Sequence, residues 1–410
     1  MATIAVLGTL DTKGHEHAFV ADWIRQAGHQ AMLIDVGTQK PPQINPSYTR
    51  ESVFSLAGED SSVLSSLKDR GAAVTKMGQV AAKALRALVE QKRIQGVISL
   101  GGGGGTSIAA TAMQALPLGF PKVIVSTLAS GNTSQYIGSK DIVLFPSVVD
   151  ISGINRISRP IFTRAAGAIC GMVESYVGFQ AVDEQPAIVA SMFGNTTGCV
   201  DRARITFKNG GFETLVFHCT GIGGQTMESI IDSGLVQGVF DVTTTELADE
   251  VVGGVLSAGP DRLNAAARAK LPAVIAPGCV DMVNFHGKES IPAKFEGRLF
   301  YEHNPQVTLM RTNVEESAKI GALIAEKVNK YTAPVSIFFP TRGLSALSAP
   351  SQPFHDPEAD QALFAAIKAN IRKDIPCKEL KANINDAPVA DAMARELLTH
   401  INTWKSKQQK

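Results

Sequence analysis

Short apolar runs alternate with longer amphipathic stretches along the whole chain. In the first half, runs bounded by Gly, Pro, Asp or Thr occur at Ile4–Leu7, Ala31–Ile34, Gly96–Leu100, Lys122–Val125 and Ile142–Phe145. Uninterrupted apolar runs of this length are typical of strands buried on both faces of a parallel sheet. Helix-like segments lie at His15–Ala27, Gln79–Gln91, Ser107–Leu116 and Phe162–Tyr176. This alternation predicts βαβ units, with helices covering the sheet.

The same pattern restarts after a polar link, Val182–Pro186, with the apolar run Ala187–Phe193. Further strands are expected at Thr214–His218, Val236–Phe240, Ala273–Ala276, Val307–Met310 and Val335–Phe339. At roughly 150 residues per domain, the length favours two units over one. We therefore predict an α/β protein of two doubly wound, mostly parallel-sheet domains covered by helices, an N-terminal one over residues 1–182 and a C-terminal one over residues 187–404.

Composition narrows the class of protein. The chain has 410 residues, 19% charged residues and a formal net charge of +1, so it offers no general electrostatic basis for binding nucleic acid. Its five cysteines are an odd number and include no C-x-x-C pair, which predicts neither a zinc site nor a disulfide framework. With no stretch of 18 apolar residues and no signal-like N-terminus, we expect a cytoplasmic protein without a membrane partner.

The most distinctive motif is the run of five glycines, Gly101–Gly105, between a predicted strand and a predicted helix. Glycines permit positive φ and a close approach of the backbone to a ligand, and successive N–H groups form a nest for an anion. The alternative is a flexible strand-to-helix turn. However, five consecutive glycines lose much conformational entropy on folding, and a simple turn does not require them. The motif predicts phosphate contacts from the following residues: Gly102, Gly103, Gly104, Gly105 and Thr106.

A second glycine-rich turn, Thr220–Thr226, also follows a predicted strand and precedes a helix. Its candidate ligand contacts are Thr220, Gly221, Gly223 and Gly224. Neither run contains the lysine of a Walker P-loop, and Thr106 and Thr226 replace the third glycine of G-x-G-x-x-G. The sequence therefore supports neither a Walker-type NTPase nor a standard NAD site.

Two further polar clusters follow predicted strands. After the first strand come Gly8, Thr9, Asp11 and Lys13, where Lys13 can neutralise phosphate and Asp11 can orient a hydroxyl or a metal-bound water. The alternative is that Asp11 or Thr12 simply caps the helix. After the run Lys122–Val125, short hydrogen-bonding groups predict ligand contacts from a second set of residues: Ser130, Gly131, Asn132 and Thr133.

Acid–base chemistry has four candidates, Asp241, Asp281, His286 and His303, each near the end of an apolar run or in a polar loop. A surface or structural role remains open for both histidines. Asp241 is also the candidate magnesium ligand, with Asp249 as a further possibility, since Mg²⁺ binds carboxylates together with phosphate oxygens. The pattern Thr243-x-x-Glu246 matches a capping box, which requires no function.

These motifs in this order resemble the ATP-binding family represented by the N-terminal half of the plant tobamovirus-resistance protein, over nearly the whole chain. The resemblance implies two α/β subdomains, binding of ATP with Mg²⁺, and a homodimer. The plant protein inhibits viral RNA replication, a role that we do not extend to this chain. It also carries a C-terminal barrel-like domain that is absent here, so a separately encoded barrel-domain partner is expected.

The leading hypothesis is thus a cytoplasmic ATP-binding protein whose ligand lies in glycine-rich strand-to-helix loops. The alternative is an enzyme that acts on a phosphorylated or carboxylated small metabolite in a cleft between the domains. A dinucleotide-dependent dehydrogenase fits the fold but lacks the complete glycine fingerprint.

Overall fold

The chain forms two compact units, Met1–Val182 and Asp183–Lys410. The structure is a computed structural model that describes residues 1–67, 69–178 and 185–408. Each unit is considered by itself below.

The N-terminal unit contains a five-stranded sheet in which every pairing is parallel, in the order β2-β1-β3-β4-β5. Its strands are β1 (Thr3–Gly8), β2 (Gln30–Asp35), β3 (Gly96–Gly101), β4 (Lys122–Ser126) and β5 (Val143–Pro146). All five coincide with the predicted apolar runs. The carboxyl ends of the strands therefore share one edge of the sheet.

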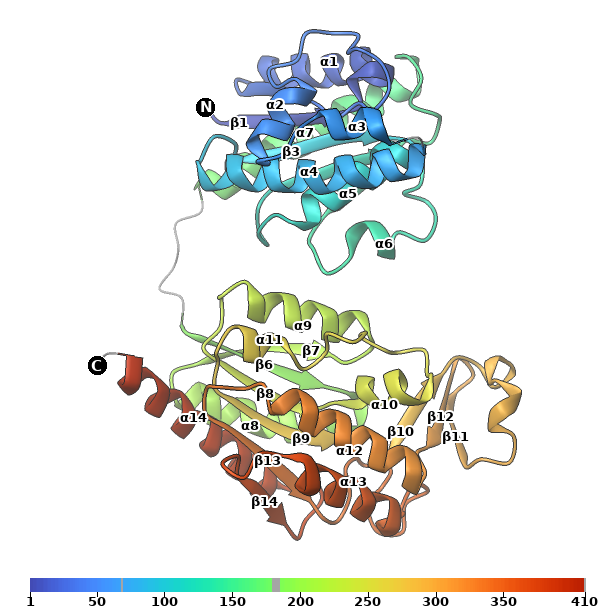
Figure 1. The fold of residues 1–410 in the computed structure, drawn as a ribbon, viewed down its shortest axis with the longest axis vertical. Helices are drawn as coiled ribbons and strands as arrows, with labels where there is room; N and C mark the ends of the chain where they lie inside the picture. The colour runs from blue at the N-terminus through green and yellow to red at the C-terminus, as the bar shows by residue number, and fades with distance from the viewer. Residues whose placement is uncertain (68, 179–184, 409–410) are drawn as a thin grey trace. The chain divides into compact units, whose positions relative to one another are not determined.

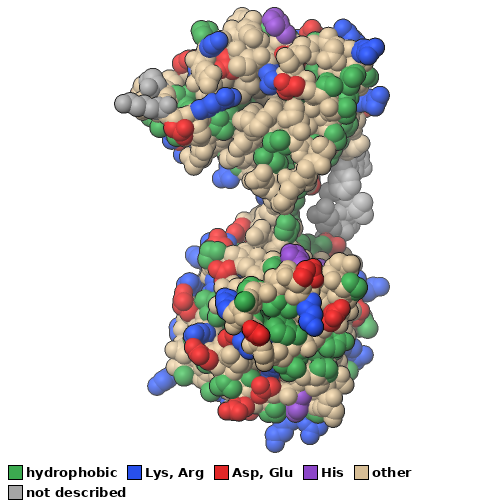
Figure 2. Space-filling view, turned by 90° about the vertical axis from the view of Figure 1, so that its right-hand side faces the viewer, with side chains coloured by type: hydrophobic (Ala, Val, Ile, Leu, Met, Phe, Trp, Pro, Cys, Tyr) green, Lys and Arg blue, Asp and Glu red, His purple; other side chains and the backbone are tan. Residues whose placement is uncertain are grey.

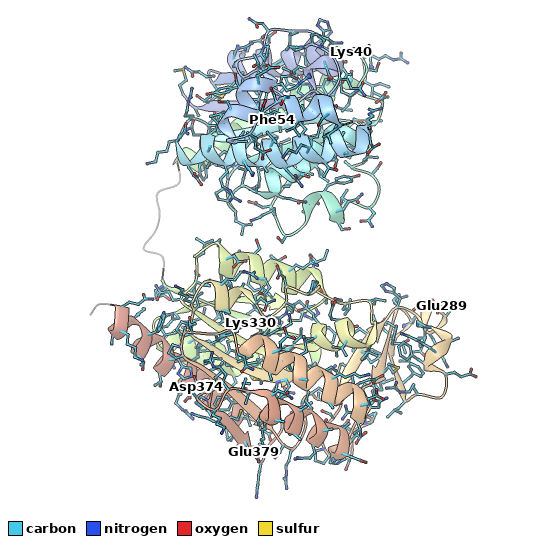
Figure 3. All side chains as sticks on the ribbon, viewed as in Figure 1. Lys40, Phe54, Glu289, Lys330, Asp374 and Glu379 are labelled. Carbon is cyan, nitrogen blue, oxygen red and sulfur yellow. The ribbon has the colours of Figure 1, made fainter. Side chains whose placement is uncertain are left out.

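Alternating side chains of β1 point into two separate cores. Ile4 and Val6 pack against α1 (Leu10–Gln26) and α7 (Ser158–Gly178), whereas Ala5 and Leu7 pack on the opposite side. The helices of that opposite layer are α2 (Arg50–Leu56), α4 (Arg70–Glu90) and α5 (Gly103–Gln114), and two shorter helices complete the unit, α3 (Ser62–Ser66) and α6 (Ser134–Ile137). Figure 1 shows the sheet between these layers. Figure 3 shows Phe54 inside the unit and Lys40 at its periphery.

The C-terminal unit has a six-stranded parallel sheet in the order β14-β13-β9-β8-β6-β7. Its strands are β6 (Ala187–Met192), β7 (Glu213–His218), β8 (Gly238–Thr243), β9 (Ala273–Gly278), β13 (Val335–Pro340) and β14 (Cys377–Leu380). Together the two sheets confirm the predicted fold class of two Rossmann-like α/β units.

Helices cover both faces of this second sheet. One face packs on α8 (Thr197–Asn209) and α14 (Ala387–Gln408). The other packs on α9 (Ile222–Asp232), α10 (Thr245–Val252), α11 (Ala265–Arg268), α12 (Val314–Val328) and α13 (Pro357–Asn370). Asp356 caps α13 by accepting a hydrogen bond from the N–H of Ala359. Exposed acidic residues lie at the periphery of the unit, as Glu289, Asp374 and Glu379 do in Figure 3.

A three-stranded antiparallel sheet extends the C-terminal unit, in the order β10 (Met282–Phe285), β12 (Val307–Arg311), β11 (Phe300–Asn304). The sequence pattern predicted only the middle strand. The outer strand β11 ends in three exposed polar residues, so it lacks the apolar run on which the strand predictions rest. The strands β10 and β14 were also missed. Among the described residues, no helix has both the length and the apolar character needed to cross a membrane.

Candidate functional site

A cavity lies where the strand order of the N-terminal sheet reverses. The chain runs from β1 outward to β2 and then returns to β3 on the other side of β1. In open α/β sheets, ligands bind at such a reversal, outside the carboxyl ends of the two strands. The cavity has a volume of about 220 Å³, and its walls come from the segments after β1, β2 and β3 together with the start of α4. The lining residues are Thr9, Asp11, Thr12, Lys13, Thr38, Gln39, Arg70, Val74, Gly102, Gly103, Gly104, Gly105 and Ile108.

The glycine run forms the beginning of α5 instead of a loop. Gly102 occupies the N-cap position and the helix starts at Gly103. None of the five glycines has a positive φ, so that part of the prediction was wrong. A Cβ on Gly101 would lie 2.4 Å from the backbone N of Thr106, whereas a Cβ on Gly103 would meet no atom within 4 Å. Gly101 is therefore required by packing, while Gly103 leaves space open at the N-terminus of the helix.

Two cationic side chains stand on the cavity wall. Arg70 is the first residue of α4 and is exposed, and among the described residues its guanidinium has neither an ion-pair nor a hydrogen-bond partner. The Lys13 ammonium donates a hydrogen bond to the carbonyl of Ile151. Lys13 itself has non-helical angles, φ −130° and ψ 29°, at a kink in α1. Sequence reasoning missed Arg70 because it lies far along the chain from every glycine-rich motif.

Asp11 organises the loop that closes one side of this cavity. One of its oxygens accepts hydrogen bonds from the backbone N–H groups of Gln39, at 3.0 Å, and Lys40, at 3.2 Å. The N-cap residue of α1 is Thr9, and no side chain makes a capping hydrogen bond there. The alternative that Asp11 or Thr12 caps this helix was therefore wrong.

His17 is fully buried between α1 and the end of β3. Its Nδ1 lies 2.7 Å from the carbonyl oxygen of Lys13, and its Nε2 accepts a hydrogen bond of 3.3 Å from the N–H of Leu100. These partners suit the neutral ring protonated at Nδ1, and burial lowers the pKa of His17. A Cβ on Gly8 would lie 2.2 Å from His17 Nε2. Gly8 thus makes room for the imidazole and does not line the cavity.

Thr106 and the Ser130–Thr133 segment differ from their predicted roles. The Thr106 hydroxyl is buried and bonds to the Gly101 carbonyl and to Ser126 Oγ, at 3.0 and 2.7 Å. It therefore ties β3 to β4. Ser130 lines a neighbouring cavity of about 310 Å³ beyond β4 and β5, but Gly131, Asn132 and Thr133 line neither cavity. The Asn132 side chain accepts hydrogen bonds from Ser134.

The second glycine-rich turn binds a carboxylate of the protein itself, that of Glu246. Glu246 Oε1 accepts hydrogen bonds from the N–H groups of Gly221 and Gly224, at 2.7 and 3.0 Å. A Cβ on Gly224 would lie 2.0 Å from Glu246 Oε2, and one on Gly223 would lie 1.7 Å from the carbonyl oxygen of His218. The N–H groups of Gly221 and Gly224 are therefore already occupied by Glu246, and ligand contacts at Thr220, Gly221, Gly223 and Gly224 stay a prediction. The predicted capping box was also wrong, because Thr243 belongs to β8 and Glu246 points away to this turn.

Arg262 forms ion pairs with three buried acidic residues of the C-terminal unit. Its guanidinium is fully buried and bonds to both oxygens of Asp241, at 2.5 and 2.7 Å, and to Glu246 at 2.7 Å. Glu228 completes the group at 3.3 Å. Since both Asp241 oxygens face the guanidinium, Asp241 lacks a free carboxylate oxygen for magnesium. Asp249 instead accepts hydrogen bonds from the backbone and side chain of Asn284, and burial raises its pKa to about 7.

The remaining acid–base candidates lie in different surroundings. Asp281 is buried, accepts a hydrogen bond of 2.7 Å from Ser345 Oγ, and has a pKa raised by burial. His286 follows β10 and His303 belongs to β11, and both are exposed. Across the described ranges, no group of three or more His, Cys, Asp or Glu residues is arranged to hold a metal ion.

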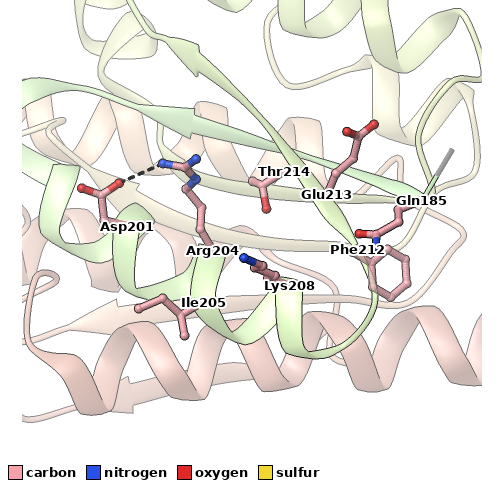
Figure 4. Close-up of a pocket in the computed structure, with 8 residues that line it drawn as sticks. All are labelled: Gln185, Asp201, Arg204, Ile205, Lys208, Phe212, Glu213 and Thr214. Carbon is pink, nitrogen blue, oxygen red and sulfur yellow. Dashed lines mark hydrogen bonds and ion pairs between the residues drawn. The ribbon is translucent and has the colours of Figure 1, made fainter. Parts of the chain in front are cut away.

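A further cavity, of about 400 Å³, lies between α8 and the start of β7 (Figure 4). Arg204 on its wall pairs with Asp201 at 3.3 Å. The cavity is at the amino end of β7, opposite to the strand ends where ligands of such sheets bind. On the face shown in Figure 2, Lys and Arg side chains are interspersed with Asp and Glu, without a broad basic surface among the residues drawn in colour.

The fold and the cavity define a two-unit Rossmann-like protein with a candidate ligand site at the strand reversal of the N-terminal unit. The family comparisons match both units: the N-terminal domain of the "Uncharacterised protein family (UPF0261)" at residues 2–178, and its C-terminal domain at residues 185–401. The chain belongs to the UPF0261 family.

Relatives span bacteria and plants. A UPF0261 protein of Clostridium tetani is 47% identical over 96% of this chain and 98% of its own length. The ToMV resistance protein Tm-1(GCR237) of Solanum lycopersicum is 40% identical over 96% of this chain, which spans 55% of the tomato protein. Likeness to solved structures is weak: a UDP-GlcNAc 2-epimerase from Neisseria meningitidis has a TM-score of 0.22 at 9% identity, covering 67% of this chain and 82% of the epimerase. The resemblance to the plant tobamovirus-resistance protein that the motifs indicated is thereby confirmed.

Proposed function

We propose that the N-terminal unit binds ATP, with the phosphates in the cavity between β1 and β3. The observation that carries this proposal is that the unpaired Arg70 lines the same cavity as the open first turn of α5. Backbone N–H groups at a helix N-terminus attract anions, and an arginine adds a fixed positive charge with several donors. Lys13 contributes a second positive charge on the same wall. A phosphate chain satisfies these groups together.

Magnesium would enter with the nucleotide. Asp11 is the carboxylate on the cavity wall, and one of its oxygens is engaged by Gln39 and Lys40. Its remaining oxygen would orient a water bound to Mg²⁺, which prefers to keep several waters and to bind phosphate oxygens directly. Without a Walker lysine in the glycine run, binding is favoured over rapid hydrolysis.

Titration calorimetry of MgATP against three proteins tests this proposal. Arg70→Ala should weaken binding about tenfold or more, because a charge-assisted hydrogen bond contributes roughly 1.5–3 kcal/mol. Arg86→Ala is the matched control, since Arg86 is also exposed on α4 but lies roughly 24 Å further along the helix. No binding to the unaltered protein, or equal affinities for all three proteins, would refute the proposal.

The family resemblance also favours two partners, a second copy of this chain and a separately encoded protein with the barrel-like domain. Light scattering tests the homodimer, and a monomer at working concentration would contradict it. Co-purification with a barrel-domain protein from a bacterial relative tests the second partner. A cytoplasmic location remains part of the proposal and is tested by fractionation of cells.

A further inference from the structure

The second cavity of the N-terminal unit lies two strand spacings further along the sheet than the first. It has a volume of about 310 Å³ and is lined by residues that follow β4 and β5. Thr127 lines this cavity, and its Oγ1 would lie 3.9 Å from a Cβ on Gly102, which lines the first. Strands are spaced by about 4.8 Å, so the β1–β3 and β4–β5 gaps are roughly 10 Å apart.

Free hydrogen-bonding groups distinguish this second cavity. Among the described residues, the hydroxyls of Thr127 and Ser130 have no hydrogen-bond partner, whereas those of Ser126 and Ser147 bond within the protein. Asp150 supplies the carboxylate: its Oδ1 accepts from the N–H of Ile151 at 2.8 Å, and its other oxygen is without a partner in the described chain. The wall thus combines one carboxylate acceptor with two hydroxyls.

The segment that carries Asp150 is tied to the first cavity. Lys13 donates to the carbonyl of Ile151, and Glu16 Oε1 accepts from the N–H of Gly153 at 2.5 Å. Both side chains come from the start of α1, which also forms the wall of the first cavity. Nearby Val148 is 77% exposed at φ +64°, a conformation unfavourable for a β-branched residue. The protein therefore holds this segment in place against local strain.

Because ionised carboxylates accept two hydrogen bonds from neighbouring hydroxyls, we propose that this second cavity binds the vicinal diol of a nucleoside di- or triphosphate, with Asp150 as its acceptor. The inference rests on the proposed function and extends it to the rest of the ligand. In many Rossmann folds the acidic residue after the second strand binds the ribose. Here that residue, Asp35, accepts from the N–H groups of Leu10 and Gly37 and faces Arg50, so it is not available. The distance between the cavities favours a diol separated from the terminal phosphate by further phosphates.

The test compares four probes: ATP, 2′,3′-dideoxy-ATP, inorganic tripolyphosphate and ribose 5-phosphate, each titrated with Mg²⁺ into the unaltered protein and Asp150→Asn. Asp150→Asn should weaken ATP about tenfold, which corresponds to 1.4 kcal/mol, and leave tripolyphosphate unchanged. Dideoxy-ATP should bind the unaltered protein as weakly as ATP binds the variant, and ribose 5-phosphate should bind least. Asp22→Asn, an exposed carboxylate of α1 that lines neither cavity, is the matched control.

The outcomes separate the two proposals. Unchanged ATP affinity in Asp150→Asn, or an equal loss for ATP and tripolyphosphate, would overturn the diol site while phosphate binding stands. Tight binding of ribose 5-phosphate that depends on Asp150 would overturn the assignment to a di- or triphosphate. If neither ATP nor tripolyphosphate binds the unaltered protein, the proposed function fails and the diol site fails with it.

Discussion

The substitution Gly103→Ala should have opposite effects on the stability of the N-terminal unit and on its affinity for ATP. Gly103 is exposed in the first turn of α5, has no positive φ, and offers a Cβ no atom within 4 Å. Glycine in such a position is less favourable than alanine by roughly 0.5–1 kcal/mol. In a unit of 182 residues, that gain raises the melting temperature by roughly 1–4 °C. The fold alone would therefore favour alanine.

The same methyl group lies in the cavity and should obstruct phosphate. Adding a methyl to a filled site costs about 1–3 kcal/mol, so ATP binding should weaken at least about fivefold. Gly167→Ala is the matched control: Gly167 lies within α7, its Cβ would also meet nothing within 4 Å, and it is remote from the cavity lining. Urea denaturation and calorimetry on the unaltered protein and both variants give the two quantities. A Gly103→Ala protein that is stabilised and keeps full ATP affinity would refute the reasoning.

Three further substitutions follow from the same geometry. Because burial holds the pKa of His17 below its ordinary value of 6.5, the unfolded chain takes up the proton first. The free energy of unfolding of the N-terminal unit should thus be highest above pH 6.5 and fall as the pH drops below that value. Urea denaturation at several pH values should show a weaker pH dependence in His17→Gln and an unchanged one in the exposed control His15→Gln. Glu246→Ala should destabilise the C-terminal unit by about 3–5 kcal/mol, since it removes the acceptor of the Arg262 Nε–H and of two glycine N–H groups; a loss below 1 kcal/mol in chemical denaturation would contradict this. Val148→Gly should raise the melting temperature by relieving positive-φ strain of about 1–3 kcal/mol, less the entropy cost of glycine; a lower melting temperature would show that the strain is absent.

The two parallel sheets were predictable, apart from the edge strand β14, because their strands are continuous apolar runs. Each β-strand of the N-terminal sheet coincides with such a run, and the burial of alternate residues of β1 on both faces explains why no polar alternation interrupts it. The antiparallel extension was found only in part, because the exposed end of β11 has the composition of a loop. An apolar run thus indicated a strand even where the strand is partly exposed, as in β5 and β7, whereas the polar β14 was missed.

The candidate site was predictable only as far as its residues are adjacent in sequence. Gly102–Gly105 and the residues after β1 meet because β1 and β3 are neighbours, as strand-end motifs suggested. Arg70 and Asp150 reach the cavities from other elements, so no local motif marks them. The turn at Thr220–Gly224 has the same local pattern as a phosphate nest, yet Glu246 fills it from 22 residues further along the chain from Gly224. Local sequence therefore indicates an anion nest without indicating which anion occupies it.

The most direct test of the central claim is an amide NMR titration of protein labelled with ¹⁵N-glycine, with MgATP as the ligand. The account predicts saturable shifts of the Gly102–Gly105 amides, which line the cavity, and unchanged signals from Gly221 and Gly224, whose N–H groups already bond to Glu246. Shifts at Gly221 and Gly224 without shifts at Gly102–Gly105 would contradict it.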